Sequence, residues 1–310
     1  MDRLSFIKYC SFAAASASMP GLINSVFSDS DSSDLFFDIS LAEWSLHRML
    51  QNGELNNLEF PAVAKNEFGI NAVEYVSGFF ADKANDKAYL DELNTRCSDL
   101  GINQLLIMID GEGNLGVTDE QERLRAVKNH HKWVRAAEYL GCHSIRVNVF
   151  GDGTRETQKA AAVDSLGRLS EFAQDYSINI IVENHGGYSS DGQWISDVMQ
   201  QVGMENCGTL PDFGNFCIKS EKGSCVEEYN RYKGVRQMMS FAKGVSAKSY
   251  AFDDRGEETT IDFRRMLKII KGAGYTGHIG VEYEGSDLGE YEGIKATKSL
   301  LLQAGKDLSQ

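Results

Sequence analysis

The chain has 310 residues, of which 42% are hydrophobic and 25% charged, and only three are prolines. This is the composition of an ordinary globular protein. The formal net charge of -14 argues against a nucleic-acid partner, because binding phosphates requires a basic face. Small neutral sugars and metal ions are compatible with it.

The first 28 residues resemble an export leader. Arg3 and Lys8 give a short basic start, and small apolar residues fill much of 11–17, an order typical of secretory signals. The alternative is an N-terminal extension without that role. Residues 29–34 are serines and aspartates, a polar linker that has no means of packing. We therefore expect a folded domain over 35–310 in an exported, periplasmic protein, or otherwise in a cytoplasmic one.

No later segment approaches the roughly 20 consecutive apolar residues that a membrane span needs. None of the cysteines has C-x-x-C spacing, so neither a zinc knuckle nor a thioredoxin-type pair is indicated. A bridge between Cys217 and Cys225 is conceivable in an exported protein, and the sequence leaves it open. The cysteines in apolar or helical surroundings are expected to be small core residues, namely Cys97, Cys142 and Cys207.

From residue 35 onward, short apolar runs alternate with longer amphipathic stretches of helical period. The expected strands cover 35–39, 71–76, 103–109, 144–149, 179–182, 207–210, 244–248 and 278–283. The expected helices cover 41–50, 86–100, 119–140, 158–176, 193–202, 226–241, 261–271 and 291–304. One strand and one helix in every 30 to 40 residues, roughly, is the spacing that βα units need.

Eight such units fit a closed (β/α)8 barrel better than an open doubly wound sheet. A dinucleotide-binding sheet would also require G-x-G-x-x-G after its first strand, and this motif is absent there. We therefore predict the α/β class, with a single (β/α)8 TIM barrel over 35–310.

Polar residues stand at the carboxyl ends of most expected strands, where TIM barrels place their chemistry. The clearest strand, 179–182, is followed by Glu183 and His185, which share one face because side chains alternate along a strand. So many polar groups at buried strand ends are unusual unless they meet partners. The whole set is Glu74, Asp110, Arg146, Asn148, Glu183, His185, Asp212, Lys248 and Glu282.

Three of these residues are carboxylates from the fifth, sixth and eighth strands. If Glu183, Asp212 and Glu282 converge on one mouth, they repel one another unless a cation lies among them. Oxygen ligands suit a hard divalent ion. The sequence therefore predicts a divalent metal site at these three positions.

Four ordered motifs carry a family resemblance: V-E-N-H at 182–185, L-P-D-F-G-N at 210–215, V-S-A-K at 245–248 and G-V-E-Y-E at 280–284. They resemble the xylose isomerase-like superfamily of sugar phosphate isomerases and epimerases, and the resemblance covers nearly everything after the linker. It implies a manganese, magnesium, cobalt or zinc ion held by Glu, Asp, His and Glu.

The chain departs from that pattern at one ligand. The four positions are here Glu183, Asp212, Ser246 and Glu282, so a serine stands in the place of the family histidine. Serine is a poor ligand beside imidazole, which leaves the fourth coordination position to water, to substrate or unused. Lys248 shares the face of Ser246 and offers a positive charge that would partly replace the metal.

The resemblance implies a metal-dependent sugar isomerase or epimerase that removes the proton α to a ketose carbonyl and proceeds through an enediolate. Glu183 and Glu282 are then the catalytic proton-transfer groups. The expected substrate-binding residues are His185, Asn215, Lys248, Arg146, Asn148 and Glu74.

For three of these residues a purely structural role is the alternative to substrate binding. For His185 it is packing within the barrel rim, and for Asn215 it is a place in a turn. For Arg146 it is neutralisation of Glu74 or another inner carboxylate.

Two other functions stay open. The same first step can expel a β-leaving group, so a lyase or hydratase acting on keto-sugars or keto-glycosides is one alternative, and an exported location favours it. A non-catalytic sugar-binding barrel is the other, and Ser246 favours it. A trinuclear zinc site of the endonuclease IV kind needs several histidines, whereas only His185 is expected at the mouth. The expected partner is a small-molecule sugar and not a nucleic acid, and oligomerisation stays open.

Overall fold

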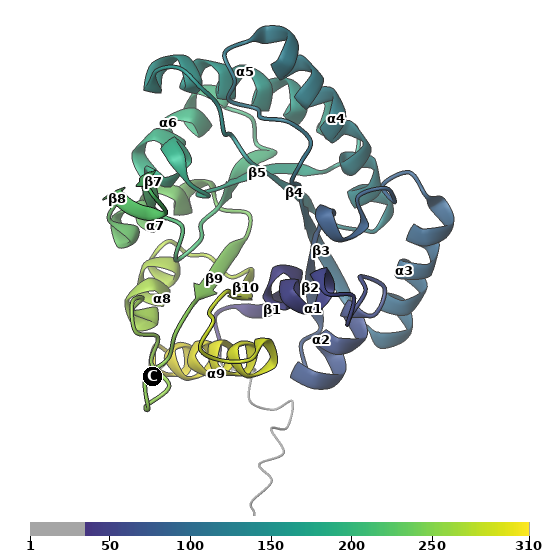
Figure 1. Ribbon diagram of the computed structural model, residues 1–310, viewed down its shortest axis with the longest axis vertical. Coiled ribbons are helices and arrows are strands. Elements are labelled where there is room, and N and C mark those ends of the chain that lie inside the picture. Colours follow the sequence, from purple (N-terminus) through teal and green to yellow (C-terminus); the bar gives the residue numbers. More distant parts are fainter. Residues whose placement is uncertain (1–34, 310) are drawn as a thin grey trace, which may run out of the picture. The chain divides into compact units, whose positions relative to one another are not determined.

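The computed structural model describes residues 35–309, so the predicted leader and linker lie outside the described residues. Eight parallel strands form one curled sheet in the order β6-β5-β4-β3-β2-β1-β10-β9, and helices lie around it (Figure 1). Parallel bridges between Thr209 and Ala242 and between Asp212 and Ser246 join the two edges of this sheet. The predicted (β/α)8 TIM barrel is thereby confirmed.

The barrel strands are β1 (Asp38–Ala42), β2 (Ala72–Val76), β3 (Asn103–Met108), β4 (Ser144–Val147), β5 (Asn179–Glu183), β6 (Cys207–Leu210), β9 (Val245–Ser249) and β10 (His278–Tyr283). The helices are α1 (His47–Gln51), α2 (Phe60–Phe68), α3 (Lys87–Leu100), α4 (Glu120–Tyr139), α5 (Arg155–Gln174), α6 (Gly192–Val202), α7 (Arg231–Met238), α8 (Phe263–Gly272) and α9 (Glu290–Asp307). Short polar side chains cap most of the longer helices, namely Asp86, Asp119, Thr154, Asp191, Asn230 and Asp262.

The sheet separates two apolar regions. The larger lies between the sheet and the helices and includes Trp133 and Trp194. The smaller fills the barrel interior with Ala42, Val76, Leu106, Met108, Ile181 and Leu210. This inner group is apolar but small, so the remaining inward positions of the strands are left to polar residues, and these make the site.

The first βα unit differs from its prediction. The strand covers 38–42 rather than 35–39, because the apolar residues before it pack against α9, where a Cβ on Gly305 would collide with Leu35 and Phe37. The following turn is a 3-10 helix (Glu43–Leu46) that precedes α1. The sequence pattern also misses α2, although Phe60, Ala64 and Phe68 recur at helical spacing and are buried.

The predicted helix at 226–241 is wrong at its start. Two short strands, β7 (Cys217–Glu221) and β8 (Ser224–Glu228), form an antiparallel hairpin there, and α7 begins only after its Asn230 cap. Lys222 and Gly223 both have positive φ, as a two-residue hairpin turn requires. A disulfide joins Cys217 to Cys225 with their Cα atoms 5.7 Å apart, so the bridge that the sequence left open is present.

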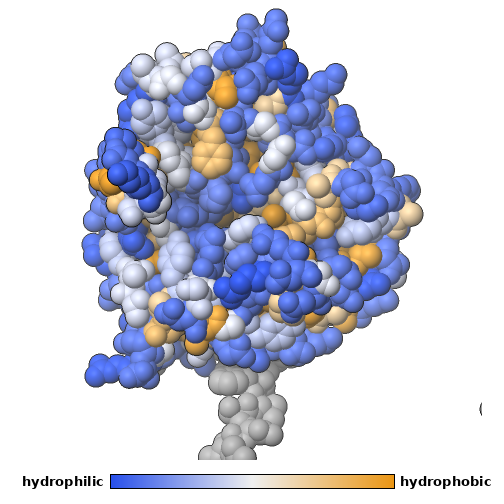
Figure 2. Space-filling model, viewed as in Figure 1, coloured by the Kyte–Doolittle hydropathy of each residue, from blue (hydrophilic) through white to orange (hydrophobic). Residues whose placement is uncertain are grey.

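The surface in the view of Figure 2 is mostly hydrophilic, with hydrophobic residues in small groups. Within residues 35–309, every helix is too short or too polar to cross a membrane.

Candidate active site

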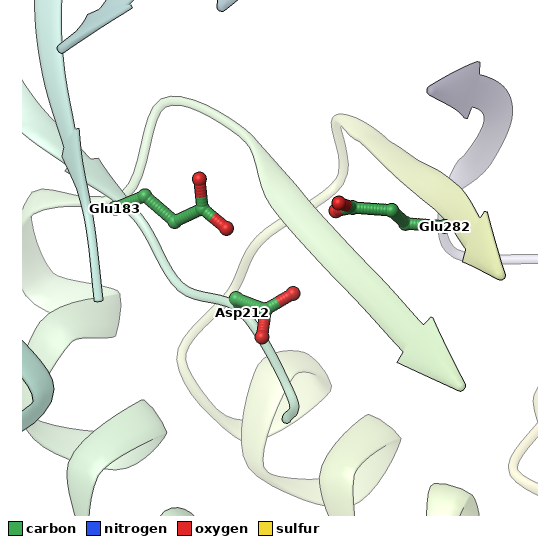
Figure 3. A group of neighbouring side chains, drawn as sticks. All are labelled: Glu183, Asp212 and Glu282. Carbon is green, nitrogen blue, oxygen red and sulfur yellow. The ribbon is translucent and has the colours of Figure 1, made fainter. Parts of the chain in front are cut away.

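Three buried carboxylates meet at the carboxyl ends of the barrel strands (Figure 3). Glu183 ends β5, Asp212 follows β6, and Glu282 lies near the end of β10. Each offers an oxygen atom, and these atoms all lie within 4.8 Å of one another. No more than 3% of any of the three residues is exposed. The structure thus brings together the three residues that the sequence analysis singled out as metal ligands.

Asp212 is held by the turn that follows β6. Its Oδ1 accepts hydrogen bonds from the backbone N–H groups of Gly214 and Asn215, at 2.8 and 2.7 Å. The buried Asn184 accepts from the Asp212 N–H at 2.7 Å and donates to the carbonyl oxygens of Asp212 and Asn215 at 3.0 Å. Asn184 therefore joins the end of β5 to the Asp212 turn.

Asn184 is not among the site residues predicted from the sequence. The available signal was its place in V-E-N-H, where it points away from Glu183 and His185 and toward the neighbouring segment. Asn215 belongs to the turn, as its structural alternative proposed, and its Nδ2 donates to Glu183 Oε1 at 3.2 Å. Its predicted role in substrate binding stays a prediction.

Ser246 lies between two of the carboxylates. Its Oγ is 2.6 Å from Asp212 Oδ2 and 2.6 Å from Glu282 Oε2. A hydroxyl has one proton to donate, so it can bond both oxygens only if one of the two carboxylates is itself protonated. In the place of the family histidine, Ser246 therefore links two candidate ligands.

Arg146 neutralises one side of the cluster. Its Nε lies 2.9 Å from Glu183 Oε2, and its Nη1 donates to Asp110 Oδ1 at 3.0 Å. Asn148 Nδ2 donates to the same Asp110 oxygen at 2.8 Å. The structural alternative expected Arg146 to neutralise Glu74 or another inner carboxylate, and the structure pairs it with Glu183 and Asp110 and not with Glu74.

Lys248 neutralises the other side. Its Nζ lies 2.9 Å from Glu282 Oε1 and 2.9 Å from Glu284 Oε2. Glu284 Oε1 in turn accepts from the indole N–H of Trp44 at 3.0 Å. Because only 2% of the Lys248 side chain is exposed, its ammonium group has lost most of its water and depends on these two carboxylates.

Burial and the nearest charges set the protonation of the cluster. Burial raises the pKa values of Glu183 and Asp212 to about 7, and the negative charge of Glu282 adds to this effect. Burial also opposes ionisation of Glu282, but the Lys248 ammonium holds the pKa of Glu282 below its usual range. Two of the three carboxylates thus take up protons near neutral pH unless a further cation is present.

This donor set fits a hard divalent ion. Arg146 binds one oxygen of Glu183, and Lys248 binds one oxygen of Glu282. The second oxygen of each glutamate and Oδ2 of Asp212 are left to hold an ion. All of these are oxygen ligands of the kind that magnesium and manganese prefer. A bound cation would also remove the reason for two buried carboxylates to be protonated.

His185 lies at the same end of the barrel, half-buried, with its ring centroid 5.9 Å from that of Phe150. Burial and the charges of Arg146 and Lys248 lower the pKa of His185 to about 4, so the imidazole is neutral. Its Nδ1 is buried and has no partner among the described residues. If His185 only packed within the barrel rim, its buried Nδ1 would have no hydrogen-bond partner there.

Glu74 is the exception among the predicted substrate-binding residues, because it lies away from the mouth. It lines a cavity of about 320 Å³ together with His143, Gly244 and His278, which precede or begin strands and mark the amino end of the barrel. Its side chain points toward Gly280, where a Cβ would lie 2.8 Å from the carboxylate oxygens. The missing side chain at Gly280 leaves room for Glu74, and alternation along β2 did not reveal this.

The sequence matches the family model of xylose isomerase-like TIM barrels over residues 62–302. No functionally curated protein matches it.

Solved structures are similar over most of the chain. The IolI protein with a bound zinc atom has a TM-score of 0.67 and 15% identity, covering 87% of this chain and 99% of that one. L-ribulose 3-epimerase has a TM-score of 0.65 and 14% identity, covering 88% and 96%. A xylose isomerase-like TIM barrel protein from Mycobacterium smegmatis in complex with magnesium has a TM-score of 0.62 and 14% identity, covering 88% and 98%. At such identities the similarity shows the fold alone.

Proposed function

The chain belongs to the xylose isomerase-like TIM barrel family, and on that premise we propose that it is a divalent-metal-dependent sugar isomerase or epimerase. The observation that carries this proposal is the convergence of Glu183, Asp212 and Glu282, whose carboxylate oxygens lie within 4.8 Å of one another. Structural neighbours that bind zinc or magnesium, or that are sugar epimerases, support it.

Glu183 and Glu282 face each other across the site (Figure 3). One carboxylate can take the proton from the carbon next to a ketose carbonyl, and the other can return a proton to the opposite face. Burial raises the pKa of Glu183 to about 7 in the protein without a metal ion. A bound divalent ion would lower this pKa, so Glu183 would be ionised in the metal-loaded site and able to accept the proton.

When bound by Glu183, Asp212 and Glu282, a divalent ion supplies Lewis-acid stabilisation for the negative charge that develops on the substrate oxygens. The protein's own residues hold the geometry around it. Arg146 fixes Glu183 and Lys248 fixes Glu282, each at 2.9 Å. Side chains that are oriented before the substrate arrives do not have to reorganise during the reaction.

A lyase or hydratase acting on keto-sugars is the second candidate, and Lys248 is the observation that favours it. Its ammonium group lies 2.9 Å from Glu282, so a fixed positive charge stands beside a proton-accepting carboxylate and would stabilise the negative charge of a departing β-group. Product mass separates the two functions, because an isomerase conserves the mass of the sugar and a lyase does not.

The test is exchange of the substrate C–H with solvent. Protein stripped with chelator and reloaded with Mn²⁺ or Mg²⁺ is incubated in D₂O with a panel of ketoses and keto-glycosides. Deuterium incorporation and product mass are followed by NMR and mass spectrometry. We expect metal-dependent exchange, and a loss of about 10²- to 10⁴-fold in Glu183→Gln and Glu282→Gln.

Glu74→Gln is the matched control, since it changes a buried glutamate at the other end of the barrel. Its exchange rate should equal that of the unmodified protein. Sugar binding without exchange in metal-loaded, unmodified protein would instead identify a non-catalytic sugar-binding barrel.

A further inference from the structure

The mouth of the barrel carries an excess of negative charge. Five carboxylates belong to the connected cluster described above, and only two cations do. The carboxylates are those of Asp110, Glu183, Asp212, Glu282 and Glu284, and the cations are Arg146 and Lys248. Even with a divalent ion bound, the fully ionised cluster would remain negative, and like charge disfavours an anionic ligand.

Both cations are already shared between carboxylates. Arg146 lies between Asp110 and Glu183, and Lys248 lies between Glu282 and Glu284, with all four contacts at 2.9 to 3.0 Å. A phosphate ester that recruited either cation would leave a carboxylate without its partner. For Glu183 and Glu282, which are almost fully buried, that loss is costly.

Two polar atoms at the same end still lack a partner. Asn148 donates through Nδ2 to Asp110 at 2.8 Å, and its Oδ1 is buried without a partner among the described residues. His185 Nδ1, on the segment after β5, is also buried without a partner among the described residues. An amide oxygen needs a hydrogen-bond donor, and a neutral imidazole has one donor and one acceptor nitrogen. A sugar hydroxyl can satisfy both, whereas a phosphate dianion is only an acceptor.

From these observations, and resting on the proposed function, we infer that the substrate is an uncharged polyhydroxylated sugar whose hydroxyl groups hydrogen-bond Asn148 and His185, and that its phosphate esters are rejected. Asn148 and His185 then determine specificity, while the proton transfer belongs to Glu183 and Glu282.

The experiment compares free ketoses with their own phosphate esters, such as D-fructose with D-fructose 6-phosphate and D-tagatose with D-tagatose 6-phosphate. Metal-loaded, unmodified protein is tested by isothermal titration calorimetry and by deuterium exchange. We expect exchange on at least one free sugar, and at least about tenfold weaker binding of its phosphate ester, since buried polar groups and charges discriminate strongly against an ill-matched substituent.

Asn148→Leu removes the unpartnered amide oxygen, together with the Nδ2 hydrogen bond to Asp110, at nearly constant size. It should raise KM for the free sugar about tenfold and change kcat little, because the lost hydrogen bond serves binding. Asn206→Leu is the matched control. Asn206 Oδ1 is also buried without a partner among residues 35–309, but the residue precedes β6, and its amide donates to the carbonyl oxygens of Ser170 and Ile178. KM should not change in this control.

The outcomes separate the inference from the proposed function. Exchange on a phosphate ester that binds as tightly as the free sugar overturns the inference and leaves the isomerase function intact. An unchanged KM in folded Asn148→Leu overturns the role of Asn148. If metal-loaded, unmodified protein exchanges no sugar of either kind, the proposed function fails, and the inference fails with it.

Discussion

At the two ends of the barrel interior, the pKa of a buried glutamate is shifted in opposite directions. At the carboxyl end, Glu282 lies 2.9 Å from the Lys248 ammonium, and its pKa is held below the usual range. At the amino end, Glu74 accepts a hydrogen bond from Ser40 at 2.5 Å, and its other oxygen has no partner within the described chain. Burial raises the pKa of Glu74 to about 8.

Burial alone therefore does not make a reactive carboxylate. Without a cation, a buried carboxyl group takes up a proton and becomes neutral, as Glu74 does. With Lys248 beside it, Glu282 keeps a charge that can hold a metal ion and accept a proton. Four predictions test this difference, and each pairs a change at the carboxyl end with a matched change at the amino end, or uses the amino end itself.

Loss of a candidate metal ligand should have the largest effect. Asp212→Ala should reduce bound Mn²⁺ or Zn²⁺ from about one per chain to almost none, because the remaining ligands come from two carboxylates that Arg146 and Lys248 already engage. The loss of affinity should exceed the roughly 10- to 100-fold seen when an outer-shell partner is removed. Elemental analysis after dialysis measures it. Glu74→Gln should keep its metal, and equal loss in both variants would contradict the assignment.

Removal of the Lys248 charge should rank second. Lys248→Met leaves Glu282 buried without its cation, which is expected to cost about 3–5 kcal/mol of the free energy of unfolding. Urea denaturation measures this cost. The control is Lys243→Met, at the cavity of the amino end. Adding Glu282→Gln to Lys248→Met should restore part of the stability. No recovery in the double variant would show that the ion pair is not the cause.

The effect of Glu74 on the free energy of unfolding should depend on pH. Its folded pKa of about 8 lies above its ordinary value of 4.5, so its contribution to stability is fully present below pH 4.5 and is lost as the pH rises toward 8. Over that window the loss amounts to several kcal/mol, at about 1.4 kcal/mol per pKa unit. Glu74→Gln should therefore gain stability relative to the unmodified protein between pH 5 and pH 8.

Urea midpoints of the two proteins at several pH values, with chelator in all samples, provide the measurement. Other buried carboxylates titrate in both proteins and cancel in the difference, apart from the repulsion that Glu282 and Glu183 exert on Glu74, which contributes to its raised pKa. A difference that does not vary with pH would mean that folding does not raise the pKa of Glu74.

The smallest effect should come from the serine hydroxyls. Ser246→Ala removes the group that links Asp212 to Glu282, and we expect metal affinity to fall by about tenfold or less, the lower range for an outer-shell change. Ser40→Ala removes the corresponding hydroxyl beside Glu74 and should leave metal affinity unchanged. Calorimetric titration with Mn²⁺ compares the two. A loss of several hundredfold in Ser246→Ala would instead identify Ser246 as a direct ligand.

Local sequence pattern predicted most of the βα units, because each unit has its own periodicity. It failed where a local signal was weak or had another meaning. The apolar run at 35–37 belongs to the packing against α9 and not to β1. The segment at 224–228 is a strand because it pairs with β7 through a tight turn and a disulfide. Neither partner is visible within the segment itself.

The sequence by itself determined the barrel and the convergence of Glu183, Asp212 and Glu282, since alternation along a strand and the common edge of parallel strands follow from chain geometry alone. Only the tertiary structure decided which cation pairs with which carboxylate, and that Glu74 turns toward the amino end. These choices depend on distances between strands far apart in the chain, and on the space left by one glycine, Gly280. Sequence periodicity predicts neither these distances nor this space.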